Sequence, residues 1–106
     1  LLTGDVVGEA EGCLRVARSF VLKVPHHGSR SSSGSGLIAS AGARLAVVSA
    51  GAHNPFGHPH PEIVERYRRS GALVLRTDRD GTVNVATDGQ RVWVRTAGEG
   101  EERRIR

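Results

Sequence analysis

Three short apolar runs, separated by segments with helical patterning, constrain the fold of this chain more than any other feature. The runs are residues 20–24, 45–49 and 72–76. The first two are apolar or β-branched at nearly every position, as in strands that are covered on both faces. Strands that alternate with helices favour a parallel sheet with crossover connections. We therefore predict an α/β fold whose first two-thirds is a parallel sheet, with residues 1–3 as the end of a further strand.

Three helices are predicted between the strands, over residues 8–18, 36–41 and 61–70. The first has an apolar stripe made of Ala10, Cys13, Leu14 and Ala17. The third has Pro61 in its first turn and Gly71 after its end, which are favoured helix start and stop residues.

The C-terminal third has a different pattern. Valines alternate with polar residues on either side of Asp88-Gly89, which predicts two half-exposed antiparallel strands joined by a tight turn. Asp80-Gly81 predicts a second hairpin turn, so that the sheet would be mixed and end in antiparallel hairpins. Residues 96–106 carry charges of both signs and are expected to form a tail or linker outside a domain at residues 1–95.

Composition excludes several protein classes. The chain has 106 residues, enough for one small domain. Its single cysteine excludes an internal disulfide and a cysteine-based zinc finger, and no apolar run is long enough to span a bilayer. The net charge of +4 suits an anionic partner such as nucleic acid. The chain has no Met and opens on a strand end, so we expect a piece of a longer protein.

Polar side chains follow the predicted strands at the points where the strands end. Asp5 follows the first strand, residues 26–29 (His-His-Gly-Ser) follow the second, and His53, Asn54, His58 and His60 follow the third. Because parallel strands end at the same edge of a sheet, these side chains should lie close together. Imidazole and carboxylate suit Zn²⁺, Mn²⁺ or Fe²⁺, and a pair of such ions can activate water and hold a phosphate for hydrolysis.

Simpler roles are open for each of these residues. Asp5 could cap the following helix, and His60 could sit beside the cap of the third helix. The adjacent histidines could be solvent-exposed, and Ser29 could reflect only the Ser-rich loop around it. A Ser–His–Asp nucleophile is conceivable, although the chain has no Gly-x-Ser-x-Gly motif.

Three sequence blocks in this order resemble the C-terminal half of the metallo-β-lactamase-like domain of the ComEC family, bacterial DNA-internalisation (competence) proteins. They are LTGD at residues 2–5, LKVPHHGS at 22–29 and NPFGHPHPE at 54–62. The later stretch LRTDRDG at 75–81 resembles the closing strands of that domain. The resemblance covers residues 1–95.

The resemblance implies half of an αββα sandwich and part of a two-metal hydrolase site that uses Zn²⁺ or Mn²⁺. Asp5 maps to the metal-bridging carboxylate and His27 to a ligand of the second metal. His26 and His58 would be catalytic, with His58 contacting a substrate phosphate or giving a proton to the leaving group. Ser29 and Asn54 would lie on the substrate side, with Asn54 supporting its loop.

The same resemblance implies what the intact protein does. It would be a nuclease that degrades the non-transported strand during uptake of single-stranded DNA, and it would need no small-molecule cofactor. Its partners would be DNA and the membrane channel region of the same protein. The full-length protein would lie in the bacterial cell membrane with this domain outside the bilayer, and the fragment itself would be soluble.

The chain departs from the wider fold in one respect. Those hydrolases take most ligands of their first metal from a His-x-His-x-Asp-His motif, which is not in these 106 residues. The chain alone is therefore expected to be inactive. The alternatives are a stand-alone phosphoesterase of the same fold, such as a phosphorylcholine esterase, and an inactive remnant or DNA-binding module.

Overall fold

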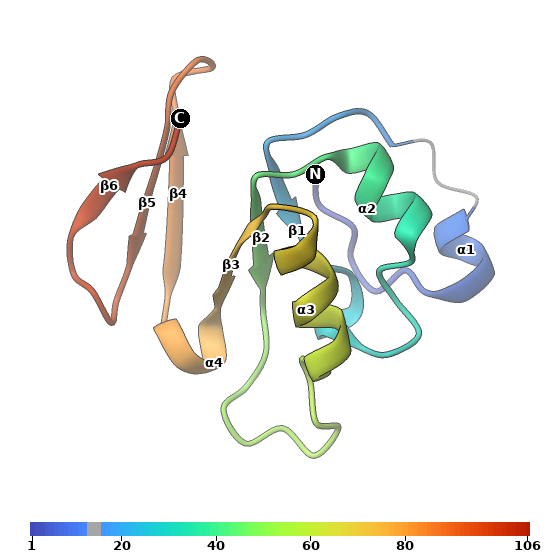
Figure 1. Cartoon of the computed structure of the whole chain (residues 1–106). Coiled ribbons are helices and arrows are strands. Elements are labelled where there is room, and N and C mark those ends of the chain that lie inside the picture. Colours follow the sequence, from blue (N-terminus) through green and yellow to red (C-terminus); the bar gives the residue numbers. More distant parts are fainter. Residues whose placement is uncertain (13–15) are drawn as a thin grey trace.

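A parallel three-stranded sheet forms the centre of the molecule. The computed structural model describes residues 1–12 and 16–106 (Figure 1). Strands β1 (Val21–Lys23), β2 (Leu45–Val48) and β3 (Leu73–Arg76) pair in that order, and all are parallel. Leu2 adds one parallel bridge to Lys23 at the outer edge of β1. The three predicted strands and the strand end at the N-terminus are thus confirmed.

Helices α2 (Ser35–Ala41) and α3 (Pro61–Arg69) cover one face of this sheet, as Figure 1 shows. Because strand side chains alternate between faces, Leu22, Val24, Ala46 and Val48 point to the same side. They form one buried cluster with Ala41 of α2 and with Ile63 and Tyr67 of α3. Both predicted helices are confirmed within one residue at each end.

The first helix is shorter than predicted. Helix α1 spans Gly8–Gly12, and residues 16–18 are not helical. Ser19 already lies beside the end of α2, where its N–H donates to Ala41 O, and β1 follows directly. Cys13 and Leu14 of the expected apolar stripe lie outside the described residues.

The opposite face of the parallel sheet packs on a second, antiparallel sheet. Strands β4 (Val83–Thr87), β5 (Val92–Thr96) and β6 (Glu102–Arg104) pair in that order. Leu45 and Leu75 of the first sheet meet Val94 of the second, with Val83 and Ile105 beside them. The fold is therefore mixed α/β with two three-stranded sheets, where we expected one mixed sheet. The turn at Asp88-Gly89 is confirmed.

Two predictions for the C-terminal third are wrong. Asp80-Gly81 does not form a hairpin turn, because Asp80 ends the short helix α4 (Thr77–Asp80) and accepts the Arg76 N–H at 2.8 Å. This helix carries the chain from one sheet to the other. Residues 96–106 are not a frayed tail, because β6 pairs with β5 and the Arg106 guanidinium lies 5.2 Å above the Phe20 ring. Their charges fit an exposed edge strand, where such residues are common. Among the described residues, no helix is long and apolar enough to cross a membrane.

Candidate functional site

Four of the predicted site residues meet at the carboxyl edge of the parallel sheet. Asp5 Oδ1 lies 3.5 Å from His27 Nε2. The rings of His26, His27 and His58 form a triangle with centroid distances of 6.1, 5.8 and 6.5 Å. Residues separated by up to 53 positions in the sequence are therefore neighbours, as the parallel topology predicts.

His27 is held in one tautomer by the strand beside it. Its Nδ1 lies 2.7 Å from Ser49 O, just after the end of β2. A carbonyl oxygen only accepts, so Nδ1 carries a proton, and Nε2 is the ring nitrogen that faces Asp5. Metal-binding histidines are typically oriented by such a bond from the other ring nitrogen to a backbone carbonyl. The backbone of His27 is left-handed, with φ 57°, which is uncommon for a residue with a side chain.

Asp5 and His26 are positioned together. The His26 N–H donates to Gly4 O at 2.9 Å, and Thr3 Oγ1 donates to Lys23 O at 2.6 Å. These bonds fix the turn that carries Asp5 against the end of β1. The Asp5 carboxylate faces His27 across this turn, and α1 begins only at Gly8. Asp5 therefore does not cap α1, and its role toward a metal remains a prediction.

Ser29 is a partner of His26. Its hydroxyl lies 3.0 Å from His26 Nδ1 and 3.2 Å from Ser31 Oγ, and the residue is only 5% exposed. These contacts set the orientation of the His26 ring. The role of Ser29 toward a substrate phosphate remains a prediction.

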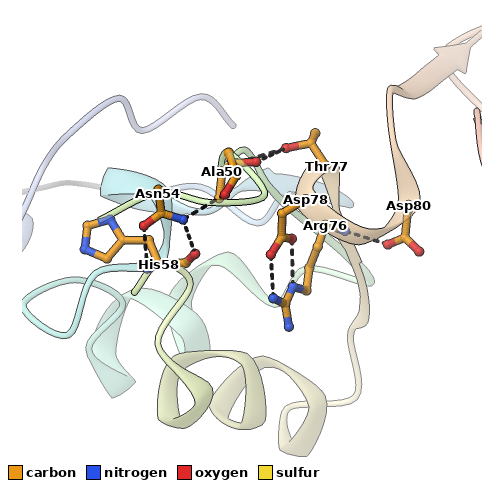
Figure 2. Close-up of polar contacts among 8 residues, drawn as sticks. Ala50, Asn54, His58, Arg76, Thr77, Asp78 and Asp80 are labelled. Atoms are coloured by element: carbon orange, nitrogen blue, oxygen red, sulfur yellow. Dashed lines mark hydrogen bonds and ion pairs between the residues drawn. The ribbon is translucent and has the colours of Figure 1, made fainter. Parts of the chain in front are cut away.

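Asn54 fixes the loop that carries His58. Its Nδ2 donates to Gly51 O at 2.9 Å and to His58 O at 2.6 Å, while its Oδ1 accepts the His58 N–H at 2.9 Å (Figure 2). One side chain thus connects the backbone on both sides of the loop. This is the loop support that the sequence led us to expect.

The two histidine segments touch through a glycine. The His60 N–H donates to Gly28 O at 2.9 Å, and a Cβ at Gly28 would lie 2.6 Å from Pro59 Cβ. Gly28 also has a φ of 78°, which disfavours any other residue. The glycine therefore allows the segment of His26 and His27 to approach that of His58. The His58–Pro59 peptide bond is cis.

His58 lines a cavity of about 210 Å³ together with His27, Asn54 and Phe56. Desolvation lowers the pKa of His58 from its usual 6.5, and electrostatic interaction with the neighbouring His26 and His27 lowers it further. The ring is therefore neutral at pH 7, a state in which one of its nitrogens accepts a proton or a hydrogen bond.

Known proteins similar to this chain share a family. The chain is 40% identical over 89 residues to ComE operon protein 3 of Bacillus subtilis (strain 168), covering 78% of the chain and 11% of that protein. It is 34% identical over 87 residues to Recombination protein 2 of Haemophilus influenzae, covering 80% and 11%. It is 35% identical over 91 residues to Competence protein ComA of Neisseria gonorrhoeae, covering 78% and 13%. The chain belongs to the ComEC family.

This ComEC-family chain spans only 11% to 13% of the length of these relatives. No family model and no solved structure matches it. The relatives confirm the resemblance that the three sequence blocks indicated.

Two histidines of the ComEC-family chain lie apart from the triangle. His60 is itself the N-cap of α3, where its ring accepts the Glu62 N–H at 3.3 Å, whereas the simpler interpretation placed it beside the cap. His53 is exposed on the loop after β2. Over residues 1–12 and 16–106, no group of three or more His, Cys, Asp and Glu side chains is placed to hold one metal ion.

Asp5 and His27 nevertheless fit a shared ion as two of its ligands. The carboxylate oxygen and the free imidazole nitrogen face each other at 3.5 Å, and their side chains are 71% and 46% exposed. A carboxylate with an imidazole is a donor set that Zn²⁺ accepts. The remaining ligands of such an ion would come from elsewhere.

Sequence reasoning missed the residues at the end of β3 and in α4 that support the carboxyl edge of the parallel sheet. Thr77 Oγ1 accepts the Ala50 N–H at 2.9 Å and donates to Ala50 O at 3.0 Å, tying α4 to the start of the His58 loop (Figure 2). Arg76 and Asp78 form a paired hydrogen bond of 3.0 and 2.7 Å beside it. The only sequence signal for these residues was the LRTDRDG stretch, to which we assigned no role in the site.

Proposed function

We propose that this chain is the C-terminal half of a metallo-β-lactamase-like αββα sandwich in a ComEC-family protein. In the intact protein it would contribute part of a two-metal site that cuts DNA phosphodiester bonds. The observation that carries this proposal is the Asp5–His27 pair, in which Ser49 O fixes the tautomer and leaves Nε2 facing the carboxylate. An ordinary surface ion pair would need no such orientation from a third group.

Asp5 would bridge two Zn²⁺ or Mn²⁺ ions, and His27 would bind the second through Nε2. When bound, such a pair of ions supplies an activated water and neutralises charge on the substrate phosphate. The chain's own residues would do the rest. His58 would contact the phosphate, or would take a proton from water and pass it to the leaving group. His26 would face the substrate, and Asn54 would hold the His58 loop.

The biological setting follows from the family resemblance. The substrate would be DNA during competence, with the non-transported strand degraded as a single strand enters the cell. The full-length protein would lie in the bacterial membrane, with this domain outside the bilayer beside the channel region. The net charge of +4 agrees with a nucleic-acid substrate.

Metal binding by the chain itself tests the ligand assignment. Titration of the chain with Zn²⁺ and Mn²⁺ by calorimetry should show binding that weakens at least about tenfold in His27→Ala, since even residues behind a ligand change metal affinity by 10–100-fold. His53→Ala is the matched control, because it removes an exposed imidazole from the neighbouring loop. Asp5→Asn should behave as His27→Ala does.

Circular dichroism of each variant shows whether the fold is retained. Equal metal affinity in the wild type and the His27→Ala variant would overturn the ligand assignment. Binding that disappears only with His53→Ala would place the metal on the loop instead. DNA binding that persists in EDTA with no metal uptake would favour a metal-free binding module.

A further inference from the structure

Phe56 is an exposed aromatic ring beside the histidine triangle. It is 77% exposed, whereas the only other residue of the described chain with a comparable exposed apolar side chain is Leu2, at 86%. Its ring centroid lies 5.6 Å from that of His58, with 29° between the planes. Phe56 also lines the cavity that holds His27 and His58.

The loop holds this ring in place despite its exposure. Asn54 bonds to the backbone before and after Phe56, at Gly51 O and at both backbone groups of His58. Stacking on His58 restrains the ring from one side. The other face of a ring with 77% exposure remains open to solvent. A restrained aromatic ring with an open face is the arrangement that stacks a nucleobase in single-strand-binding proteins.

We propose that Phe56 is a stacking platform for one nucleobase of single-stranded DNA, next to the phosphate that the histidines face. This inference rests on the proposed function and deepens it by naming the residue that positions the strand. Because the ring centroids of Phe56 and His58 are only 5.6 Å apart, a base stacked on Phe56 lies beside the histidines. A base on Phe56 therefore sets its own or the adjacent phosphate at His58 and His27. The contact reads no sequence, because every base has a stacking face.

The main competing explanation is that Phe56 is an ordinary exposed apolar residue with no ligand. Isolated exposed apolar residues are common and need no ligand. Phe56 differs because it is aromatic, is stacked on a site histidine and borders the cavity. Leu2, which is equally exposed, has none of these properties in the described structure.

Oligonucleotide binding by the whole chain tests the proposal. A fluorescein-labelled single strand of about ten nucleotides, a typical site size for such proteins, is compared with an abasic strand of equal length. Fluorescence anisotropy is measured in EDTA so that neither strand is cut. The wild type should bind the base-containing strand about tenfold more tightly, a factor that corresponds to one stacked base.

The variants separate stacking from general effects. Phe56→Ala should remove the preference for the base-containing strand and leave the abasic strand unaffected, while Phe56→Trp should keep the preference. Leu73→Ala is the control and should behave as wild type. It truncates a partly exposed side chain at the start of β3, away from the carboxyl edge that carries the site.

An unchanged preference in Phe56→Ala would overturn the proposal. So would an equal loss of affinity for both strands, or no measurable binding of either strand by the wild type. The metal titration of the preceding section does not involve Phe56. A failure here with metal binding through His27 intact would therefore leave the hydrolase proposal standing.

Discussion

At the scale of single residues, the site concentrates backbone strain and oriented side chains. His26 and His27 have φ values of 46° and 57°, and both carry side chains in a region that favours glycine. Neither residue would be selected there for stability, because that conformation costs about 1–2 kcal/mol per residue. Outliers of this kind cluster at functional sites, where the surrounding structure holds them. The strain therefore supports a functional reason for both imidazoles.

A pair of substitutions at one position measures this strain. His27→Gly and His27→Ala both remove the imidazole and its bond to Ser49 O. Glycine tolerates positive φ but loses more chain entropy on folding, and the relief of strain should outweigh that loss. We expect the glycine variant to be more stable than the alanine variant by about 1 kcal/mol in urea unfolding. Equal stability, or a more stable alanine variant, would contradict the left-handed conformation.

Tyr67 offers a second test in the core. Its hydroxyl lies 2.8 Å from Ser33 Oγ, and burial raises its pKa from 10.0 to about 12, with a smaller contribution from the Glu11 carboxylate. Tyr67 is the only tyrosine, so tyrosinate absorbance reports it alone. The folded chain should titrate near 12. A raised pKa stabilises the fold below the unfolded-state value of 10.0, and this stability is lost as the pH rises toward 12. A midpoint near 10 while circular dichroism is still native would contradict the packing.

At the scale of elements, two loops and two strand ends form the site, and a few contacts connect them. Gly28 lets the turn after β1 touch Pro59, Asn54 folds the loop before α3, and Thr77 holds Ala50 at the end of β2. Each contact joins segments that are distant in sequence. Loss of any one should therefore separate groups of the histidine triangle without unfolding the sheet.

Gly28→Ala is the sharpest change at this scale. The new methyl would lie 2.6 Å from Pro59 Cβ, at a φ of 78°. We expect a loss of about 1–3 kcal/mol in the free energy of unfolding and weaker metal binding, because the His26–His27 turn must move away from the His58 loop. Gly51→Ala, where a Cβ meets nothing within 4 Å, is the control. Unchanged stability in Gly28→Ala would contradict the close approach.

The ion pair between Arg76 and Asp78 makes the stability of the fold depend on pH in the acid range. The two side chains are 21% and 10% exposed, and hydrogen bonds from Arg76 lower the pKa of Asp78. A lowered pKa stabilises the fold above the unfolded-state value of about 3.9, and this stability is lost as the pH falls through the folded-state value. Asp78→Asn should cost about 2–3 kcal/mol at pH 7, and this cost should shrink as the pH falls through the lowered folded-state pKa of Asp78. A cost that stays the same as the pH falls would contradict the charged pair.

At the scale of the whole molecule, the sequence predicted what depends on simple patterns. The apolar runs at residues 20–24 and 45–49 were long enough to identify buried strands, and parallel topology then predicted that Asp5 and His27 would meet. The second sheet was not foreseen, because β6 is short and charged and its pairing with β5 depends on contacts such as Arg106 over Phe20. Helix α4 was also missed, because a carboxylate of Asp80 bonding to Arg76 N outweighed the hairpin preference of Asp-Gly. The role of Ser49 O was invisible, since any residue has a carbonyl.

The proposed hydrolase function depends on Asp5 and His27 binding one metal ion together. Anomalous diffraction from crystals of the chain grown with Zn²⁺ or Mn²⁺ tests it most directly. If the two residues share the ion, the anomalous peak should lie within about 2.0–2.2 Å of both Asp5 Oδ1 and His27 Nε2, with Nδ1 of His27 still on Ser49 O. Metal bound only at His53 or His60, with Asp5 and His27 left as an ion pair, would contradict it.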